Sequence, residues 1–545
     1  MSSTNIEIAD ADKTVESVDV RADAMAPPDP DKPRVVVTRV EFIGILFALM
    51  MLFFSASLLG TIIATALPSI ANQLNDMNDY SWVATAFLLT STAIQPVSGV
   101  LSDIFGRKAV VILAAFIFLV STIVSGFSQS MIMLIVARAV QGLGGGIITS
   151  MVYIVVGDIV APKKRGPYQG MNSAVFSVAT VLGPIIGGYF TDSSAGWRWC
   201  FFIVAPFTFI ALVCVFFLMK IPSSPGTFRD KIHRLDGWGI LTVSSGVVLM
   251  LLGLTWGGST YPWTSATVLC LLIFGFLMLI VFVLVEAKVS REPMMPMDLF
   301  TVFNFNASSI IAFTVGFQLY GFIYFIPLYY QIIHNYNATQ AGLSLLPIVL
   351  ALSFSSIISG LTISRFGLTR PFSIGGMALL TISIGLLIIL DENSSITIEY
   401  LLHALVGLAM GPTMQTITLF VQGSVPVRRL ASATAVNTFF RTLGGVFGVT
   451  LFQTIMTSRF QSALASRLGP NVSLAGTGSF DPTTIWALPP NIRTPVVQSF
   501  VDAFRMVWLV CCCIVGFGFL FTLLLKPLNW DARKNPKATK VPESN

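Results

Sequence analysis

The segment SGVLSDIFGRKAV, residues 98–110, places one acid and two bases between two long apolar runs. Gly106 supplies the backbone freedom for a tight turn between these runs. The two bases follow the glycine directly, where basic side chains hold the start of a membrane helix at the polar surface. Asp103 lies one helical turn after Gly99 and on the same face. The segment therefore predicts two membrane helices joined by a tight turn, with a glycine and an acid turned together toward a neighbouring helix.

The rest of the composition is that of an integral membrane protein. Hydrophobic residues make up 54% of the 545 residues and charged residues 11%, whereas roughly a quarter of the residues in soluble domains are charged. Apolar runs of the length needed to cross a bilayer, about 20 residues, recur along the chain. We predict fourteen spans, which begin near residues 41, 81, 109, 131, 168, 198, 238, 264, 306, 341, 371, 397, 434 and 504.

The basic residues predict how these spans are oriented. Most of the 32 lysines and arginines fall in segments on one side of the predicted membrane, among them Arg107, Lys108 and the run from Lys163 to Arg165. Short cytoplasmic loops carry this excess of basic residues, so both termini are expected in the cytoplasm. The polar, acid-rich residues 1–40 contain no signal peptide and predict a disordered tail.

A weak internal repeat divides the chain. SGVLSDIFG at residues 98–106 shares four residues with SGLTISRFG at 359–367. This offset exceeds the roughly 200 residues that six spans with short loops would take, so two further helices are expected between the halves. The predicted organisation is a cytoplasmic tail at 1–40, a six-helix bundle at 41–220, two extra helices at 221–290, a second six-helix bundle at 291–526 with an extracytoplasmic loop at 458–503, and a cytoplasmic tail at 527–545.

Seven motifs occur in order along these spans: GVLSDIFGRK (99–108), ARAVQGLGGG (137–146), GPIIGG (183–188), WRW (197–199), WGGSTYPW (256–263), REPMMPMDLF (291–300) and FFRTLGGVFGV (439–449). Together they resemble the major facilitator superfamily, in particular its fourteen-span drug:proton antiporters of the fungal type. The resemblance implies an all-α membrane protein with two six-helix bundles and two intercalated helices, in which the bundles rock around a midplane site.

The resemblance also implies a gate at the cytoplasmic ends of the helices. In the family, the acid matched by Asp103 caps the start of a helix in the other half, here span thirteen, when the cytoplasmic side is closed. A carboxylate at a helix start stabilises it by about 0.3–1 kcal/mol. The alternative is that the bases only anchor the helices at the membrane surface. The candidate gating residues are Gly99, Asp103, Gly106, Arg107, Lys108, Asp158 and Arg165.

Polar residues inside the apolar runs predict a cavity and a coupling site. Arg138 would cost about 2.5–3.5 kcal/mol at the centre of a span, so it should face a cavity, face a partner or reach the nearer surface. The resemblance gives it a role in coupling proton movement to substrate movement, with Gln141 on the same helical face. Each other polar residue either lines the cavity or bonds to another helix. The candidates are Gln95, Arg138, Gln141, Asn172, Gln318, Tyr324, His403, Gln415, Asn437 and Arg441.

Two features bear on transport direction and coupling. The GPIIGG motif, with Gly183, Pro184, Gly187 and Gly188, is typical of exporters in the superfamily, although small residues also serve helix packing alone. Fourteen-span members commonly carry an aspartate in span one where this chain has Leu59. No acid is expected near the centre of a span. We therefore hypothesise that proton coupling runs through Arg138, Asp103 and Asp158, with His403 either a proton carrier or a neutral core residue.

The sequence thus predicts a proton-coupled exporter of small amphiphilic drugs, toxins or metabolites, with no cofactor, metal or nucleic-acid partner expected. There is no G-x-x-x-x-G-K-[ST] phosphate loop for an ATP-driven pump, and no catalytic cluster for an enzyme. A vacuolar carrier for basic amino acids and a non-transporting sensor remain alternatives. We expect a monomer in the plasma membrane or, alternatively, the vacuolar membrane, with glycosylation at Asn471, Asn337 and Asn393.

Overall fold

The computed structural model describes residues 35, 37–74, 82–221, 227–257, 261–288, 290, 293–468 and 485–528. Within these residues, fourteen helical segments are long and apolar enough to cross a membrane. The predicted all-α membrane fold with fourteen spans is therefore confirmed. The predicted tails at 1–40 and 527–545 lie almost entirely outside the described residues.

The first bundle holds six spans. They are α1 (Arg39–Gln73), α2 (Trp82–Phe105), α3 (Arg107–Gly126), α4 (Met131–Ile159), α5 (Arg165–Asp192), and a sixth span made of α6 (Trp199–Phe202) and α7 (Val204–Leu218). Gly106 joins α2 to α3 with a φ of 91°, a conformation that only glycine adopts without strain. This is the tight turn that residues 98–110 predict.

Two further helices follow a short helix, α8 (Phe228–His233). They are α9 (Gly237–Trp256) and α10 (Ala266–Lys288), which pack against each other, while α9 also contacts α2 and α16 (Leu430–Leu468). The Asp236 carboxylate caps α9 by accepting from the Gly239 N–H at 2.8 Å. Glu286 at the end of α10 accepts from the backbone N–H groups of Met294 and Met295. Both acids thus have structural partners at span ends.

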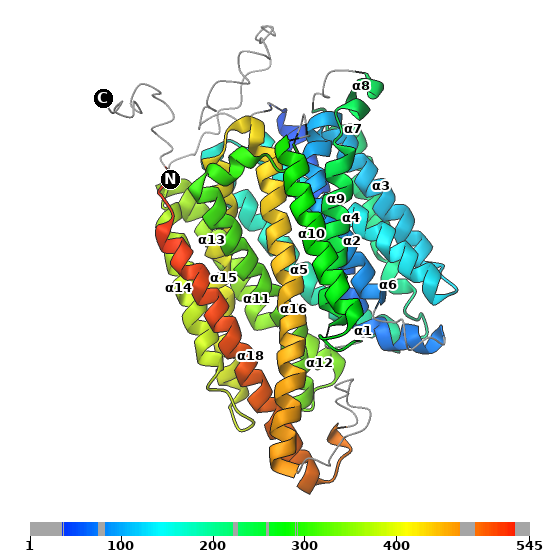
Figure 1. Cartoon of the computed structure of the whole chain (residues 1–545), viewed down its shortest axis with the longest axis vertical. Helices are drawn as coiled ribbons and strands as arrows, with labels where there is room; N and C mark the ends of the chain where they lie inside the picture. The colour runs from blue at the N-terminus through cyan, green and yellow to red at the C-terminus, as the bar shows by residue number, and fades with distance from the viewer. Residues whose placement is uncertain are drawn as a thin grey trace.

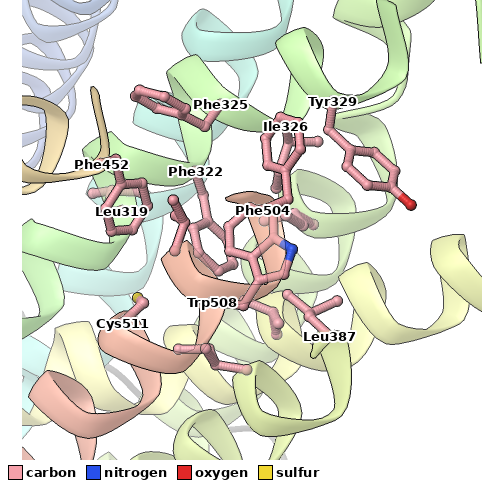
Figure 2. Close-up of a cluster of buried hydrophobic side chains, with 14 of the residues drawn as sticks. Leu319, Phe322, Phe325, Ile326, Tyr329, Leu387, Phe452, Phe504, Trp508 and Cys511 are labelled. Atoms are coloured by element: carbon pink, nitrogen blue, oxygen red, sulfur yellow. The ribbon is translucent and has the colours of Figure 1, made fainter. Parts of the chain in front are cut away.

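The second bundle holds the remaining six spans. They are α11 (Phe303–Ile333), α12 (Ala338–Leu343) with α13 (Leu346–Phe366), α14 (Thr369–Leu387), α15 (Ile396–Ser424), α16, and α18 (Pro490–Leu524). Its core is aromatic: Phe322 and Phe452 pack with Trp508, between α11, α16 and α18. Figure 2 shows this cluster, with the Tyr329 hydroxyl directed away from it. Because aromatic side chains bury large areas, this core holds the long helices together.

The predicted loop at 458–503 is in part wrong. Helix α16 continues to Leu468, and α18 already begins at Pro490, so both arms of this segment are helical. The arms hold each other through stacked rings of Phe460 and Phe500, with centroids 4.0 Å apart, and through an Arg467–Asp502 ion pair. At 1.5 Å per residue, α16 is about 58 Å long and exceeds the hydrocarbon core of a bilayer. The runs of apolar residues predicted where the spans lie, but they did not predict these more polar extensions of the helices.

The antiparallel spans give the molecule two ends. We call the end where α2 turns into α3 the Arg107 end, and the opposite end, where α5 connects to α6, the Trp197 end. The Arg107 end is uppermost in Figure 1, and the α16–α18 arms extend at the bottom. The two bundles meet mainly through α5 against α13 and α2 against α16. These two helix pairs frame the candidate site.

Candidate functional site

A cavity lies between the two bundles and takes its walls from both. It contains about 810 Å³ of space between the side chains, including the part that opens to solvent. Helices α1, α2, α4 and α5 supply one wall, and α11, α15 and α16 supply the other. The lining residues are Phe53, Ala56, Ser57, Gly60, Thr61, Phe87, Leu88, Ser91, Gln95, Gly145, Thr149, Tyr153, Phe176, Leu319, Tyr320, Ile323, Tyr324, Met414, Arg441 and Thr442.

Arg441 provides the cavity with a cation. Its Nη1 donates to the Tyr153 hydroxyl at 3.3 Å, and its guanidinium lies 5.1 Å from the centre of the Tyr153 ring. Tyr153 belongs to α4 and Arg441 to α16, so this contact crosses between the bundles. Tyr153 also packs edge-on against Phe53 of α1. Sequence reasoning identified Arg441 and missed Tyr153, although a hydroxyl within the apolar run of span four was a usable signal.

The predicted cavity residues divide into two groups. Gln95, Tyr324 and Arg441 line the cavity, and Gln318 lines a smaller pocket beside it. The other candidates do not line it. Among these, Asn172 donates to Gln169, Gln415 to the Ser356 carbonyl, and Asn437 to the Ser308 carbonyl. Gln415 and Asn437 thus bond to another helix, the alternative that the sequence left open, whereas the bond of Asn172 stays within α5.

Arg138 is buried one layer behind the cavity wall. Its guanidinium lies 4.4 Å from the centre of the Phe87 ring, which lines the cavity. It donates to the Val83 carbonyl at 2.9 Å and to Gln141, which in turn donates to Thr122. Asp158 lies 20 residues further along α4, about 30 Å away at 1.5 Å per residue. The structure thus brings Arg138 and Gln141 together but does not bring Arg138 to Asp103 or Asp158.

The acids at the Arg107 end instead bind Arg107. Its Nε donates to Asp158 at 2.8 Å, and its Nη1 donates to Asp103 at 2.5 Å and to the Ser102 carbonyl at 2.8 Å. The Asp158 side chain is 2% exposed and that of Asp103 is 31% exposed. Arg107 therefore ties the end of α2 to the end of α4 through a buried ion pair.

Two other predicted gating residues bond to the backbone. The Lys108 ammonium donates to the Phe216 carbonyl of α7 at 2.7 Å. Arg165 donates to the carbonyls of Gly157 and Val160. These bonds connect neighbouring helices inside the first bundle, so both residues help to fix the packing of these helices at the Arg107 end.

The bundles touch each other at this end through glycines. A Cβ on Gly99 would lie 3.0–3.1 Å from Ala431, Ser432 and Ala435 at the start of α16. A Cβ on Gly166 of α5 would lie 2.5 Å from the carbonyl oxygen of Gly360 in α13. A side chain at Gly166 would collide with the Gly360 backbone, and one at Gly99 would require its neighbours to shift by a few tenths of an ångström. The Arg107 end is therefore closed across both helix pairs by direct backbone contact.

The GPIIGG motif lies on α5 between two neighbours. A Cβ on Gly183 would lie 2.1 Å from Thr61 Oγ1 of α1, while Pro184 and Gly188 face Gly342 and Thr339 of the second bundle. The Gly187 carbonyl accepts a hydrogen bond from Thr191 at 2.7 Å. The motif thus lets α5 approach both bundles closely.

A buried polar cluster lies at the start of α15 and was missed by the sequence analysis. The Glu399 carboxylate is fully buried and accepts from the Tyr329 hydroxyl at 3.0 Å and pairs with His334 at 3.0 Å. His403, one turn along α15, contacts the Glu399 carbonyl through Nδ1 at 2.7 Å. The sequence analysis expected no acid near the centre of a span, and Glu399 does lie near a span end, in the first turn of α15. It did not show that this turn is buried.

Replacing Glu399 should reveal what this cluster contributes. Glu399→Ala leaves Tyr329 and His334 without their partner, and each buried polar group so stranded costs about 1–3 kcal/mol. We expect a clear fall in the thermal unfolding midpoint of the purified protein in detergent. Glu399→Gln keeps an acceptor for Tyr329 and should lose less. Equal midpoints for the alanine variant and the unchanged protein would show that the cluster adds no stability.

The predicted glycosylation sites differ in their structural setting. Asn471 lies outside the described residues. Asn393 is exposed in the turn between α14 and α15. Asn337 begins α12, and its side chain accepts from the Gln340 N–H at 2.8 Å as part of a capping box. A glycan on Asn337 would have to leave this acceptor oxygen in place.

Comparison with known proteins shows which family has a matching sequence. The family model described as "Major Facilitator Superfamily" matches residues 49–449. The chain is 32% identical over 525 residues to "Multidrug transporter protein MdtP" of Bacillus subtilis (strain 168), across 90% of this chain and 95% of that protein. It is 33% identical over 485 residues to "Efflux pump dotC" of Dothistroma septosporum (strain NZE10 / CBS 128990), across 88% and 83% of the two chains.

Solved structures agree on the fold. A bacterial homologue of the human lysosomal transporter Spinster, solved in an inward-facing and occupied conformation, gives a TM-score of 0.54 at 16% identity, covering 90% of this chain and 97% of that one. The human organic anion transporter MFSD10 gives a TM-score of 0.53 at 14% identity, covering 87% and 98%. With a family model that matches most of its length, fourteen spans and two bundles around a shared cavity, the chain belongs to the major facilitator superfamily.

Proposed function

We propose that the protein is a secondary active exporter, which moves small amphiphilic molecules out of the cytoplasm by alternating access. The observation that carries the proposal is the cavity shared by the two bundles and closed at the Arg107 end by glycine contacts. A site at the interface of two bundles is exposed to one side at a time when the bundles rock. The relatives named as a multidrug transporter and an efflux pump support export.

We propose that the Arg107 end faces the cytoplasm. Arg107, Lys108, Arg165, Arg365 and Arg429 lie at or near helix ends on this side, as the positive-inside rule requires. Both termini are then cytoplasmic, and the structure is shut toward the cytoplasm. We further propose a monomer in the plasma membrane, with the vacuolar membrane as the alternative.

Proton exchange is the proposed driving force. Among the described residues that line the cavity there is no carboxylate. Buried carboxylates lie instead beside Arg107, in the Glu399 cluster and at Glu286. Proton binding would therefore weaken or strengthen the contacts that close the Arg107 end. It would affect substrate binding only indirectly. Arg138 contacts Phe87 of the cavity wall but lies about 30 Å from Asp158 along α4, so it is not in contact with these acids.

The two alternatives differ from this proposal in testable ways. A carrier for basic amino acids needs an acid to bind its cationic substrate, and the described cavity lining provides a guanidinium instead. A non-transporting sensor would bind ligands without moving them. We therefore favour export over both.

Growth of cells exposed to toxic amphiphiles tests the proposal. Cells that express the protein should tolerate at least one compound in a panel of anionic, neutral and cationic amphiphiles better than cells without it. A protonophore should abolish this tolerance if protons drive export. Tolerance that survives the protonophore would refute proton coupling, and identical growth on every compound would refute export.

A further inference from the structure

We propose that the central cavity takes an amphiphilic aromatic anion, whose acidic oxygen binds Arg441. This inference rests on the proposed function, because it names the class of molecule that the same cavity would export. It follows from the charge of the cavity, from its aromatic walls and from the N–H donors of Arg441.

The cavity has a net positive charge. Arg441 is the one formally charged side chain among the described residues that line it. Among the described residues, its side chain contacts the hydroxyl and the ring of Tyr153, both of them neutral. A guanidinium between two membrane bundles is far less costly when an opposite charge accompanies it. An anionic ligand supplies the charge that the wall does not provide.

The position of Arg441 suits a carboxylate or a comparable acidic group. Arginine presents several N–H donors in a planar fork that matches two acceptor oxygens at once. Tyr153 engages Nη1 from the side of α4. A ligand bound to the other donors would contact both bundles, since Arg441 and Tyr153 belong to different ones. The substrate would thus be held at the seam that alternating access opens and closes.

The remaining walls fit an aromatic body. Three phenylalanines, Phe53, Phe87 and Phe176, line the side formed by the first bundle, and Tyr320 and Tyr324 line the opposite side. Rings gain from offset or edge-on contact with other rings. The hydroxyls of Thr61, Thr149 and Thr442 already donate to backbone carbonyls, so they offer a ligand acceptor lone pairs only. Gln95 Oε1 is buried without a hydrogen-bond partner, so a ligand hydroxyl could also be accommodated.

A matched series of fluorescent probes tests the charge preference. The probes are 1-pyrenebutyrate, 1-pyrenebutanol and 1-pyrenebutylamine, which share one aromatic body and carry an anionic, a neutral and a cationic end. Binding to the purified full-length protein is measured by fluorescence polarisation, and movement by release from proteoliposomes. The butyrate should bind about 10- to 100-fold more tightly than the amine, the difference expected for a charge-assisted pair.

Variants at Arg441 test whether its guanidinium causes the preference for the anionic probe. Arg441→Gln should remove the difference between the butyrate and the butanol, and Arg441→Lys should restore part of it. Arg365→Gln makes the same substitution at an exposed arginine outside the cavity and should leave the preference unchanged. A purely structural role for Arg441 would weaken binding of all three probes equally, which would overturn the assignment.

The outcomes separate this inference from the proposed function. Release of the butanol or the amine, with no preference for the butyrate, overturns the anionic class while export stands. Preferential binding of the butyrate without release from proteoliposomes supports the anion site and counts against export. Absence of binding by all three probes overturns the cavity as the ligand site, and with it both proposals.

Discussion

Gly166→Ala should reduce export by about tenfold or more while the protein still inserts normally into the membrane. The added Cβ would lie 2.5 Å from the Gly360 carbonyl oxygen, which is backbone and has no side-chain freedom to move away. Overpacking of this kind costs about 1–3 kcal/mol, and each 1.4 kcal/mol changes a conformational equilibrium tenfold. The cost falls on the state closed at the Arg107 end, because only there do α5 and α13 meet at these residues.

This prediction is checked by transport and by labelling. Gly360→Ala should behave like Gly166→Ala, since its Cβ would lie 2.6 Å from the Gly166 carbonyl oxygen. Gly375→Ala is the matched control, because nothing lies within 4 Å of a Cβ at that position. A cysteine at Ser432, in a background without the six native cysteines, should react faster with a cytoplasmic maleimide in Gly166→Ala. Export at the unchanged rate in both glycine variants would rule out this contact as the gate.

Asp158→Ala should destabilise the protein strongly. It removes the buried partner of Arg107. The Arg107 side chain is 9% exposed, and its Nε lies 2.8 Å from Asp158 Oδ2. Breaking a buried ion pair from one side costs about 3–5 kcal/mol, and Asp103, which is 31% exposed, compensates the remaining Arg107 charge only in part. We expect a markedly lower thermal unfolding midpoint and less protein in the membrane.

Two comparison variants separate charge from packing. Asp103→Asn removes the partly exposed partner. We expect a loss of about 1 kcal/mol or less in stability, as for surface pairs, together with slower transport. The double variant Arg107→Met/Asp158→Leu removes both buried charges and should recover part of the lost stability. If Asp158→Ala unfolds at the same temperature as the unchanged protein, the buried pair does not hold α2 to α4.

The sequence predicted the spans better than the contacts between them. Long apolar runs and the Gly106 turn follow from local physics, so the fourteen spans and the connection after α2 could be derived from the residues alone. The end of α16 could not, because polar residues between Thr457 and Leu468 form a helix supported by Phe500 and Asp502, which lie over 30 residues away. A local hydropathy pattern cannot predict contacts between residues that lie so far apart in the sequence.

The candidate site shows the same limit. The sequence singled out Arg441 and Arg138 because an arginine in an apolar run needs an explanation. It did not distinguish the one that lines the cavity from the one buried behind Phe87, since that depends on how α4 and α16 are rotated. Glu399 was overlooked for a related reason. Its partners, Tyr329 and His334, come from α11, and only packing shows that an acid near a span end is fully buried.

The contact between Gly166 and Gly360 also has an entropic consequence. A gate built from long side chains must restrict their rotamers each time it closes, at up to about 1.5–2 kcal/mol for each lysine, arginine or methionine. Glycine has no rotamers to lose, so two backbones can meet and separate here without that cost. A contact of this kind suits a protein that has to shut and reopen the same end in every cycle.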